Sequence, residues 1–311
     1  MKQIVTAVEL PEEASELLEG VGSVVGPAGW REALGEAEAL ITPVNVRVGA
    51  SLLEEAPRLR IVANAGVGYD NLDIPAARER GIILTNTPGV LTEATADIAL
   101  LLTLAVVRGL PAAERSLRRG EFSGWGFGDY LQGDIQGARV GILGMGRIGQ
   151  AYARRVRASG AIIQYHSRGP INPAVEQALE ATRVDRDTLF RTSDILSIHA
   201  AYSPSLHHHL DTATFRLMQR GSYLVNTARG AFIDEQALVT ALHDGHLAGA
   251  GLDVYEHEPK VHPGLQDLEN VVLLPHIGSA TPKTRTAMAR MACENAAAVL
   301  RGEPPLTPIP G

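Results

Sequence analysis

The chain has 311 residues and a formal net charge of -7; 45% of its residues are hydrophobic and 20% are charged. These values are typical of a folded globular protein and exclude wholesale disorder and fibrous classes. The acidic balance and the lack of long basic runs argue against a nucleic-acid-binding surface, and the length predicts two domains.

Membrane insertion and disulfide bonding are not expected from this sequence. The longest strongly apolar run, residues 98–107, is shorter than the roughly 20 residues that a membrane-spanning helix needs. The N-terminal segment turns acidic after a few apolar residues, unlike a signal peptide. The single cysteine, Cys293, lies in an Ala-rich helical pattern and is expected to pack in a core. We therefore expect a cytoplasmic protein with no membrane contact.

The first part of the chain alternates short apolar runs with helical patterns, which predicts a parallel sheet. A long apolar helix is expected next, over Leu91–Val107, and then a loop rich in Gly and aromatic residues over Glu121–Gln136. The strands expected before that helix are Ile4–Val8, Ala39–Thr42, Arg60–Ala63 and Ile82–Thr85, and the helices are Pro11–Glu19 and Pro75–Arg80.

A second alternating series begins at Ala138. Six parallel strands complete a doubly wound sheet, so the last helix, Pro282–Leu300, is expected to pack on the first domain. The expected strands are Arg139–Leu143, Ala161–Tyr165, Ile195–His199, Tyr223–Asn226, Gly249–Val254 and Val271–Leu274, and the helices are Ile148–Arg157, Asp211–Met218 and Asp234–His243. The prediction is an α/β fold with two doubly wound parallel-sheet domains, residues 1–92 with 282–311 and residues 93–281, and an interdomain cleft.

A glycine-rich turn, GILGMGRIGQ, joins the first strand of the second series to its helix. The spacing of Gly144, Gly146 and Gly149 is the dinucleotide-binding fingerprint in its required strand–turn–helix context. The three glycines allow the tight turn, the backbone approach to the pyrophosphate and the close packing of the helix, respectively. The helix N-terminus, at Arg147 and Ile148, presents N–H groups that bind phosphate.

The choice of cofactor depends on the end of the next predicted strand. NAD-specific sites carry an acidic residue there, which binds the ribose 2′-hydroxyl, but this chain has Ser167 followed by Arg168. A hydroxyl and a guanidinium would bind a 2′-phosphate that a carboxylate would repel. We therefore predict a preference for NADP(H), with NAD(H) possible; the alternative role of Arg168 is to stack on the adenine of either cofactor.

Charged residues follow three further predicted strands: Arg229, Glu258 and His276. Ligands of open α/β sheets bind outside the carboxyl ends of the strands, so these residues are expected to converge beside the dinucleotide. The histidines 207 to 209 are adjacent in sequence, so their side chains are expected to diverge and not to form a metal site. No metal is predicted.

Six motifs resemble the D-isomer-specific 2-hydroxyacid dehydrogenase family, and most closely its glyoxylate/hydroxypyruvate reductase branch. They span most of the chain: AGVGYDN (65–71), TEATADIALLLTLAVVR (92–108), GILGMGRIGQ (141–150), LVNTARGAFIDEQALVTAL (224–242), AGAGLDVYEHEP (248–259) and NVVLLPHIGSAT (270–281). The resemblance implies a flavodoxin-like substrate domain, a Rossmann coenzyme domain and the catalytic set Arg229, Glu258 and His276.

The resemblance implies further contacts. The backbone of Val67 and Gly68 would bind the substrate carboxylate, and Trp125 would reach the active site of the partner subunit in a twofold homodimer. The other expected cofactor contacts are Thr95, His199, Thr227, Asp253 and Gly278.

The residue types suit the reduction of a 2-oxo acid, which needs a hydride at the carbonyl carbon and a proton at the oxygen. His276 would donate the proton, Glu258 would orient the imidazole, and Arg229 would bind the carboxylate and the carbonyl oxygen. The expected reactions convert glyoxylate to glycolate and hydroxypyruvate to D-glycerate. The alternatives are a 2-ketogluconate reductase, a phosphoglycerate dehydrogenase and a non-catalytic, dinucleotide-sensing protein that resembles the corepressors of this family.

Overall fold

A computed structural model describes residues 2–310, and the chain divides into two compact units. The first unit consists of the residues up to Leu91 together with those from Ser279 onward, and the second consists of Thr92–Gly278. The chain therefore leaves the first unit once and returns to it at the end of the second.

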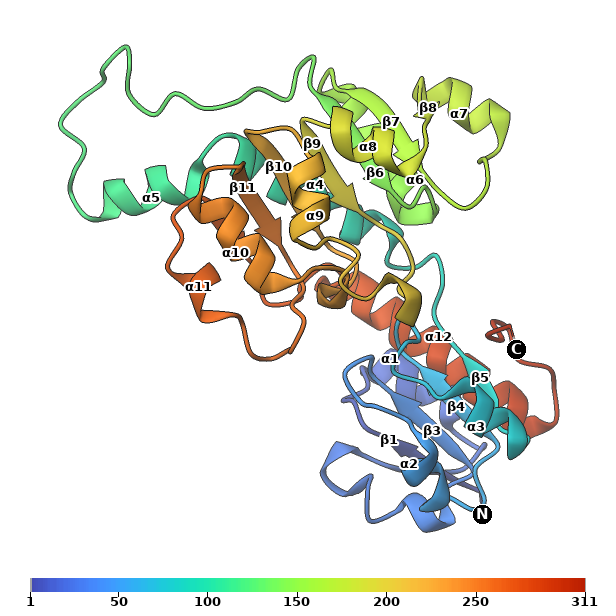
Figure 1. Ribbon diagram of the computed structural model, residues 1–311. Coiled ribbons are helices and arrows are strands. Elements are labelled where there is room, and N and C mark those ends of the chain that lie inside the picture. The colour runs from blue at the N-terminus through green and yellow to red at the C-terminus, as the bar shows by residue number, and fades with distance from the viewer. Residues whose placement is uncertain (1, 311) are drawn as a thin grey trace. The chain divides into compact units, whose positions relative to one another are not determined.

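The first unit contains a parallel five-stranded sheet in the order β2-β1-β3-β4-β5. Helix α12 packs on one face of this sheet through small side chains, among them the fully buried Cys293 (Figure 1). Burial raises the pKa of the Cys293 thiol to about 12. The strands are β1 (Gln3–Thr6), β2 (Ser23–Val25), β3 (Ala39–Thr42), β4 (Ile61–Asn64) and β5 (Ile83–Thr85), and the helices are α1 (Glu12–Ser15), α2 (Ala50–Glu54), α3 (Ile74–Glu79) and α12 (Pro282–Arg301).

Successive residues of the central strands alternate between two cores. Ile4 packs with α12, whereas the next residue, Val5, packs with Leu52 and Leu53 of α2 on the opposite face. Both faces of a parallel sheet are covered in this way. This two-sided burial explains why the strands are continuous apolar runs rather than alternating ones.

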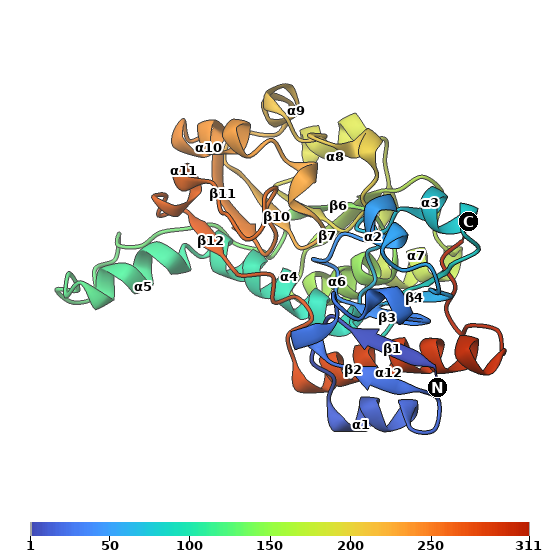
Figure 2. The ribbon, with the colours of Figure 1, turned by 90° about the horizontal axis from the view of Figure 1, so that it is seen from below.

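The second unit contains a parallel seven-stranded sheet in the order β12-β11-β10-β9-β6-β7-β8. Helices α4 and α6 cover one face and α8, α9 and α10 cover the other (Figures 1 and 2). The strands are β6 (Arg139–Leu143), β7 (Ile162–His166), β8 (Thr182–Arg183), β9 (Ile195–Ile198), β10 (Ser222–Asn226), β11 (Leu247–Leu252) and β12 (Val271–Leu273). The helices are α4 (Thr92–Val107), α5 (Leu110–Arg118), α6 (Arg147–Ala158), α7 (Pro173–Leu179), α8 (Arg186–Thr192), α9 (Thr212–Leu217), α10 (Glu235–His243) and α11 (Pro263–Gln266).

The predicted fold class, two parallel-sheet α/β domains, is confirmed. The prediction of six strands in the second sheet is wrong, because β8 adds a seventh at the edge beside β7. β8 contains two residues, both exposed, and β2 is a mostly exposed edge strand of three. Neither carries the buried apolar run by which the other strands were predicted.

Helix α5 and the loop after it extend away from the body of the second unit (Figures 1 and 2). Residues 119–138 contain neither helix nor strand, as predicted for the loop. Helix α5 together with the first part of this loop, residues 110–131, is here called the arm. Its exposed large apolar side chains are Leu110, Leu117, Phe122, Trp125, Phe127, Tyr130 and Leu131.

Within residues 2–310, no single helix is long and apolar enough to cross a membrane. Helices α4 and α5 reach the required length and hydropathy only when they are taken together, and they meet at an angle of 68°. Half of the residues of α4, including Ala96, Leu102 and Val106, are buried against the second sheet and α6.

Candidate active site

The carboxyl ends of six strands of the second sheet carry the residues that the sequence analysis selected. In the order of the strands across the sheet, these residues are His276 after β12, Asp253 after β11, Thr227 after β10, His199 after β9, Gly144 after β6 and Ser167 after β7. Parallel strands place these ends along one edge. The order of the strands reverses between β9 and β6, which is where open α/β sheets bind their ligands.

The imidazole of His276 and the carboxylate of Glu258 form a hydrogen-bonded pair. Nδ1 of His276 lies 2.8 Å from Oε2 of Glu258, and the other carboxylate oxygen, Oε1, accepts from the backbone N–H of Tyr255 at 3.1 Å. About a third of each side chain is exposed, 34% for His276 and 33% for Glu258. The pair is therefore fixed in orientation and still open to a small molecule.

The charge state of Glu258 follows from its surroundings. Burial alone would raise the pKa of Glu258, but the hydrogen bond from His276, the positive charge of that imidazole and the charge of Arg229 together hold it below the ordinary value. An ionised carboxylate only accepts hydrogen bonds, so Nδ1 of His276 carries the shared proton. The other ring nitrogen, Nε2, is left available to exchange a proton with a ligand.

Arg229 lies at the start of the short 3-10 helix Gly230–Phe232, just after β10. Its Nη1 donates to the carbonyl oxygen of Ala228 at 2.8 Å, and its charge acts on Glu258. The next residue, Gly230, packs directly against the backbone of Tyr255. Only glycine fits there, because a Cβ atom at position 230 would lie 1.8 Å from the carbonyl carbon of Tyr255. The sequence-predicted set of Arg229, Glu258 and His276 is thus brought together within the second unit.

His276 has a left-handed backbone conformation, with φ of 53°, which is unfavourable for a residue other than glycine. The carboxylate of Asp253 stabilises the turn, accepting from the N–H of Ile277 and the N–H of Gly278, both at 2.7 Å. Burial raises the pKa of Asp253 above its ordinary value, and these two hydrogen bonds partly offset that effect. Asp253 therefore positions the segment that presents the imidazole.

The glycine turn after β6 has the geometry that a pyrophosphate requires. Gly144 has φ of 99°, and a Cβ atom there would lie 2.3 Å from the backbone nitrogen of Ala200. At Gly146, no neighbouring atom lies within 4 Å of the position that a Cβ atom would take. Helix α6 begins at Arg147 without a side-chain cap, whereas α8, α9, α10 and α12 are each capped by an Asp or Thr side chain. The first N–H groups of α6, including that of Ile148, are thus left for an anion.

Two polar atoms near the switch point are buried without a hydrogen-bond partner among the described residues: Nδ1 of His199 and Oγ1 of Thr227. Such groups are costly to leave unpaired, so they fit a site that is completed by a ligand. Thr95, in the first turn of α4, is also buried, and its side chain would lie 3.4 Å from a Cβ atom at Gly278.

The end of β7 bears two guanidinium groups rather than one. Ser167 and Arg168 follow the strand, and Oγ of Ser167 donates to the carbonyl oxygen of Gly169 at 2.6 Å. Arg183 of β8 donates through Nη2 to the carbonyl oxygen of Ser167 at 3.2 Å. Sequence reasoning missed Arg183, because the two-residue strand that brings it beside Ser167 gives no recognisable pattern.

In the first unit, the turn containing Val67 and Gly68 is held through its carbonyl groups. Those of Val67 and Gly68 accept from the side-chain amides of Asn86 and Asn64, both at 2.8 Å, and that of Gly66 accepts from Thr87 at 2.9 Å. A trans peptide directs its N–H opposite to its C=O. The N–H groups of Val67 and Gly68 therefore point away from these partners and can receive an anion.

Two expectations concern surface residues, and the prediction that Trp125 reaches a partner subunit stays a prediction. Trp125 is 84% exposed in the arm and contacts Phe127 edge to face, with the ring centroids 6.3 Å apart. The prediction that the adjacent histidines diverge is wrong for His207 and His208, whose rings stack with their centroids 4.0 Å apart. The reason is the left-handed backbone of His208, with φ of 49°, which alternation along the chain does not anticipate.

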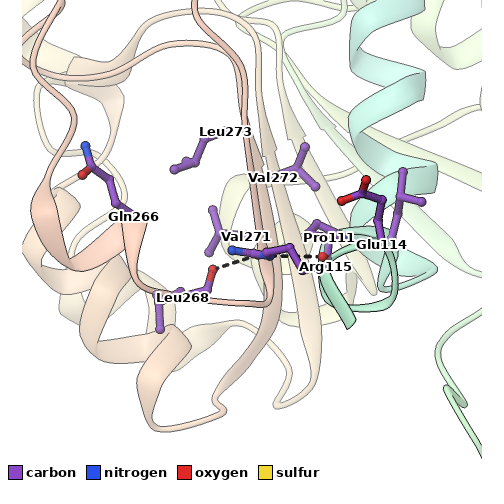
Figure 3. Close-up of a pocket in the computed structure, with 9 residues that line it drawn as sticks. Pro111, Glu114, Arg115, Gln266, Leu268, Val271, Val272 and Leu273 are labelled. Atoms are coloured by element: carbon purple, nitrogen blue, oxygen red, sulfur yellow. Dashed lines mark hydrogen bonds between the residues drawn. The ribbon is translucent and has the colours of Figure 1, made fainter. Parts of the chain in front are cut away.

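An apolar depression of about 380 Å³ lies elsewhere in the second unit, between α5 and the segment that leads into β12 (Figure 3). Arg115 crosses it and donates to the carbonyl oxygens of Pro111 and Leu268, at 3.1 and 3.4 Å. The lining contains none of the predicted site residues: Leu110, Pro111, Glu114, Arg115, Gln266, Leu268, Val271, Val272 and Leu273. Four of these lining residues belong to the arm, and none belongs to the His276–Glu258 pair.

Comparison with known proteins shows which family model and which proteins this chain is similar to. The model of the NAD-binding domain of D-isomer-specific 2-hydroxyacid dehydrogenases matches residues 100–278. Glyoxylate reductase of Thermococcus litoralis is 45% identical over 278 residues, which cover 88% of this chain and 84% of that protein.

Solved structures are similar over nearly their full length. A protein from Thermus thermophilus superposes with a TM-score of 0.91 at 40% identity, covering 100% of both chains. The NADPH-dependent glyoxylate/hydroxypyruvate reductase of Sinorhizobium meliloti, solved with NADP and malonate, superposes with a TM-score of 0.88 at 34% identity, covering 99% of this chain and 96% of that one.

Proposed function

Because this chain belongs to the D-isomer-specific 2-hydroxyacid dehydrogenase family, we propose that it reduces glyoxylate to glycolate and hydroxypyruvate to D-glycerate. The observation that carries the proposal is the His276–Glu258 pair, 2.8 Å apart at the end of β12, with the charge of Arg229 acting on it. Relatives named glyoxylate reductase support the choice of substrate.

The residues of the pair divide the acid chemistry between them. Nε2 of His276 donates a proton to the carbonyl oxygen, while Glu258 holds Nδ1 and stabilises the positive charge of the imidazole. Arg229 binds the substrate carboxylate and counters the negative charge that develops on the carbonyl oxygen. The dihydronicotinamide supplies the hydride when it is bound. The exposed third of His276 lets the imidazole recover its proton from solvent after each turnover.

The cofactor is NADP(H) in preference to NAD(H). Ser167 occupies the place of the usual acidic residue, and Arg168 and Arg183 supply two positive charges beside it. A 2′-phosphate is favoured by two guanidinium groups and would be repelled by a carboxylate. The NADP complex of the related Sinorhizobium meliloti reductase supports this choice.

The active form is a twofold homodimer in which the arm contacts the second subunit. Its exposed side chains, Leu117, Phe122, Trp125 and Phe127 among them, form an apolar surface that a monomer would leave in water. The indole of Trp125, exposed on the arm, is available to enter the active site of the partner subunit. Cyclic twofold symmetry is the commonest arrangement of soluble oligomers.

The decisive experiment is a panel of 2-oxo acids assayed with NADPH and with NADH. We expect the highest kcat/KM with glyoxylate or hydroxypyruvate and NADPH. A preference for 2-ketogluconate would move the assignment within the family. Inactivity with every short 2-oxo acid, together with retained NADPH binding, would favour a dinucleotide sensor instead.

A further inference from the structure

A cluster of side chains of types that commonly ligate metals lies outside the His276–Glu258 pair. It consists of His207, His208 and Glu256, whose candidate ligand atoms all lie within 4.8 Å of one another. Nε2 of His208 is 2.6 Å from Oε1 of Glu256, and Nε2 of His207 is 4.0 Å from the same oxygen. Two imidazoles thus direct the same ring nitrogen toward one carboxylate oxygen.

The backbone is built to produce this convergence. Neighbouring side chains of an extended segment normally point to opposite sides. The left-handed conformation of His208, φ of 49°, cancels that alternation and stacks its ring on that of His207, with 20° between the ring planes. The N–H of His208 donates to the carbonyl oxygen of Ala231 at 3.0 Å, which holds this unfavourable conformation in place.

Glu256, the third side chain of the cluster, is held more firmly than a surface carboxylate. The side chain of Glu256 is only 13% exposed, and its backbone N–H donates to Oε1 of the buried Glu235 at 2.9 Å. On the other side of the cluster, Nδ1 of His207 lies 3.4 Å from the hydroxyl of Tyr202. Such an outer partner orients a ligating imidazole by holding the nitrogen that does not bind the metal.

The donor set selects the class of ion. Two imidazole nitrogens and one carboxylate oxygen suit a borderline cation such as Zn²⁺, whereas Ca²⁺ and Mg²⁺ prefer oxygen ligands throughout. Ligand atoms about 2.1 Å from a tetrahedral zinc ion lie about 3.4 Å from one another. The observed separations, 2.6 and 4.0 Å, lie on either side of that value, so metal binding requires the hydrogen bond between His208 and Glu256 to open and the stacked rings to rotate toward the ion.

We propose that His207, His208 and Glu256 form a binding site for a divalent transition-metal ion of the Zn²⁺ type, with the fourth position left to water. The ion fastens the loop that carries the two histidines to the segment that carries Glu258, two residues after Glu256. This site is separate from substrate reduction, so it does not depend on the proposed substrate.

The test uses the full-length, tag-free protein after treatment with EDTA and dialysis, titrated with ZnCl₂ by calorimetry and assayed for bound zinc. We expect one zinc ion per chain and a rise in Tm with added zinc. His208→Gln and Glu256→Gln should each weaken binding by at least about tenfold. His243→Gln is the matched control, because His243 is 80% exposed and lies beside Asp244, away from the cluster.

Circular dichroism and thermal unfolding without zinc establish that each variant is folded. Should His208→Gln be unstable, the exposed His207→Gln provides the same test. Zinc binding that is unchanged in the double variant His207→Gln/His208→Gln would overturn the proposal, and so would the absence of saturable binding in the wild type. Equal binding of MgCl₂ would also contradict it, because the donor set would then not select the ion.

Discussion

Glu258 accepts a hydrogen bond from Nδ1 of His276 at 2.8 Å, and this contact leaves Nε2 as the only ring nitrogen free to serve a substrate. We predict that His276→Gln lowers kcat for glyoxylate reduction by about two to four orders of magnitude, the range of general acid catalysis. NADPH binding, measured by fluorescence titration, should change little, because the proton donor acts in the transition state. Near-normal turnover in this variant would show that another group supplies the proton.

Glu258→Gln tests the charge of the pair rather than its position, because the amide has nearly the same shape. The carboxylate accepts from Nδ1 of His276 and faces the positive charge of the imidazole, so the amide should reduce kcat by about 10–100-fold and leave KM for glyoxylate nearly unchanged. A variant with near-normal kcat would mean that Glu258 only shapes the loop.

The same carboxylate predicts how stability depends on acid. The pKa of Glu258 is held below the ordinary value of about 4.3. A depressed carboxylate pKa stabilises the fold above the unfolded value, and this contribution is lost as the pH falls through the folded value. The difference in the free energy of unfolding between wild type and Glu258→Gln should thus be largest at neutral pH and shrink below pH of about 4.

The sequence predicted the family, the two sheets and the residues of the acid pair, because each rests on a local pattern. Buried parallel strands are continuous apolar runs, and charged residues directly after such strands stand out. The order of parallel strands then brings Arg229, Glu258 and His276 to one edge without further information. Family membership, predicted from six motifs, is confirmed by the comparisons.

The features that were missed depend on tertiary contacts. The position of Arg183 beside Ser167 depends on a two-residue strand, and the stacking of His207 on His208 depends on one left-handed residue. Asp253 was selected as a cofactor contact, which stays a prediction, but the sequence did not indicate that its side chain accepts two backbone N–H groups of the turn that follows His276. No spacing rule on a single sequence reports which of its neighbours a carboxylate will face.

Cofactor preference should reverse when a negative charge is placed at the end of β7. Ser167→Asp should raise KM for NADPH by at least about tenfold and leave KM for NADH unchanged or lower, because the carboxylate repels the 2′-phosphate. Arg183→Ala should likewise raise KM for NADPH and leave KM for NADH nearly unchanged. Arg216→Ala, an exposed arginine on α9, is the matched control. If Arg183→Ala changes KM for NADPH and KM for NADH equally, Arg183 does not bind the 2′-phosphate.

Trp125 should act across the dimer. Trp125→Ala should impair turnover, whereas Phe127→Ala, its exposed neighbour on the arm, should have a smaller effect. Mixing the impaired Trp125→Ala chain with the inactive His276→Gln chain, after dissociation and reassociation, distinguishes the subunits. Half of the dimers are then hybrid, and one site of each hybrid is intact, so activity should rise to about a quarter of the wild-type value. No rise above the residual activity of the separate variants would place Trp125 in its own active site.

His199 should make the protein sensitive to acid. Burial lowers the pKa of its imidazole to about 3, whereas the unfolded chain binds that proton near pH of about 6.5. The unfolded state therefore holds more protons between these values, and stability should fall by up to about 1.4 kcal/mol per pH unit as the pH decreases from 6.5 toward 3. Urea unfolding across this pH range should show that the free energy of unfolding of His199→Gln depends less steeply on pH. The difference in slope from the wild type should correspond to about one proton. The exposed His243→Gln should retain the wild-type slope, and a wild-type slope in His199→Gln would contradict the buried neutral state.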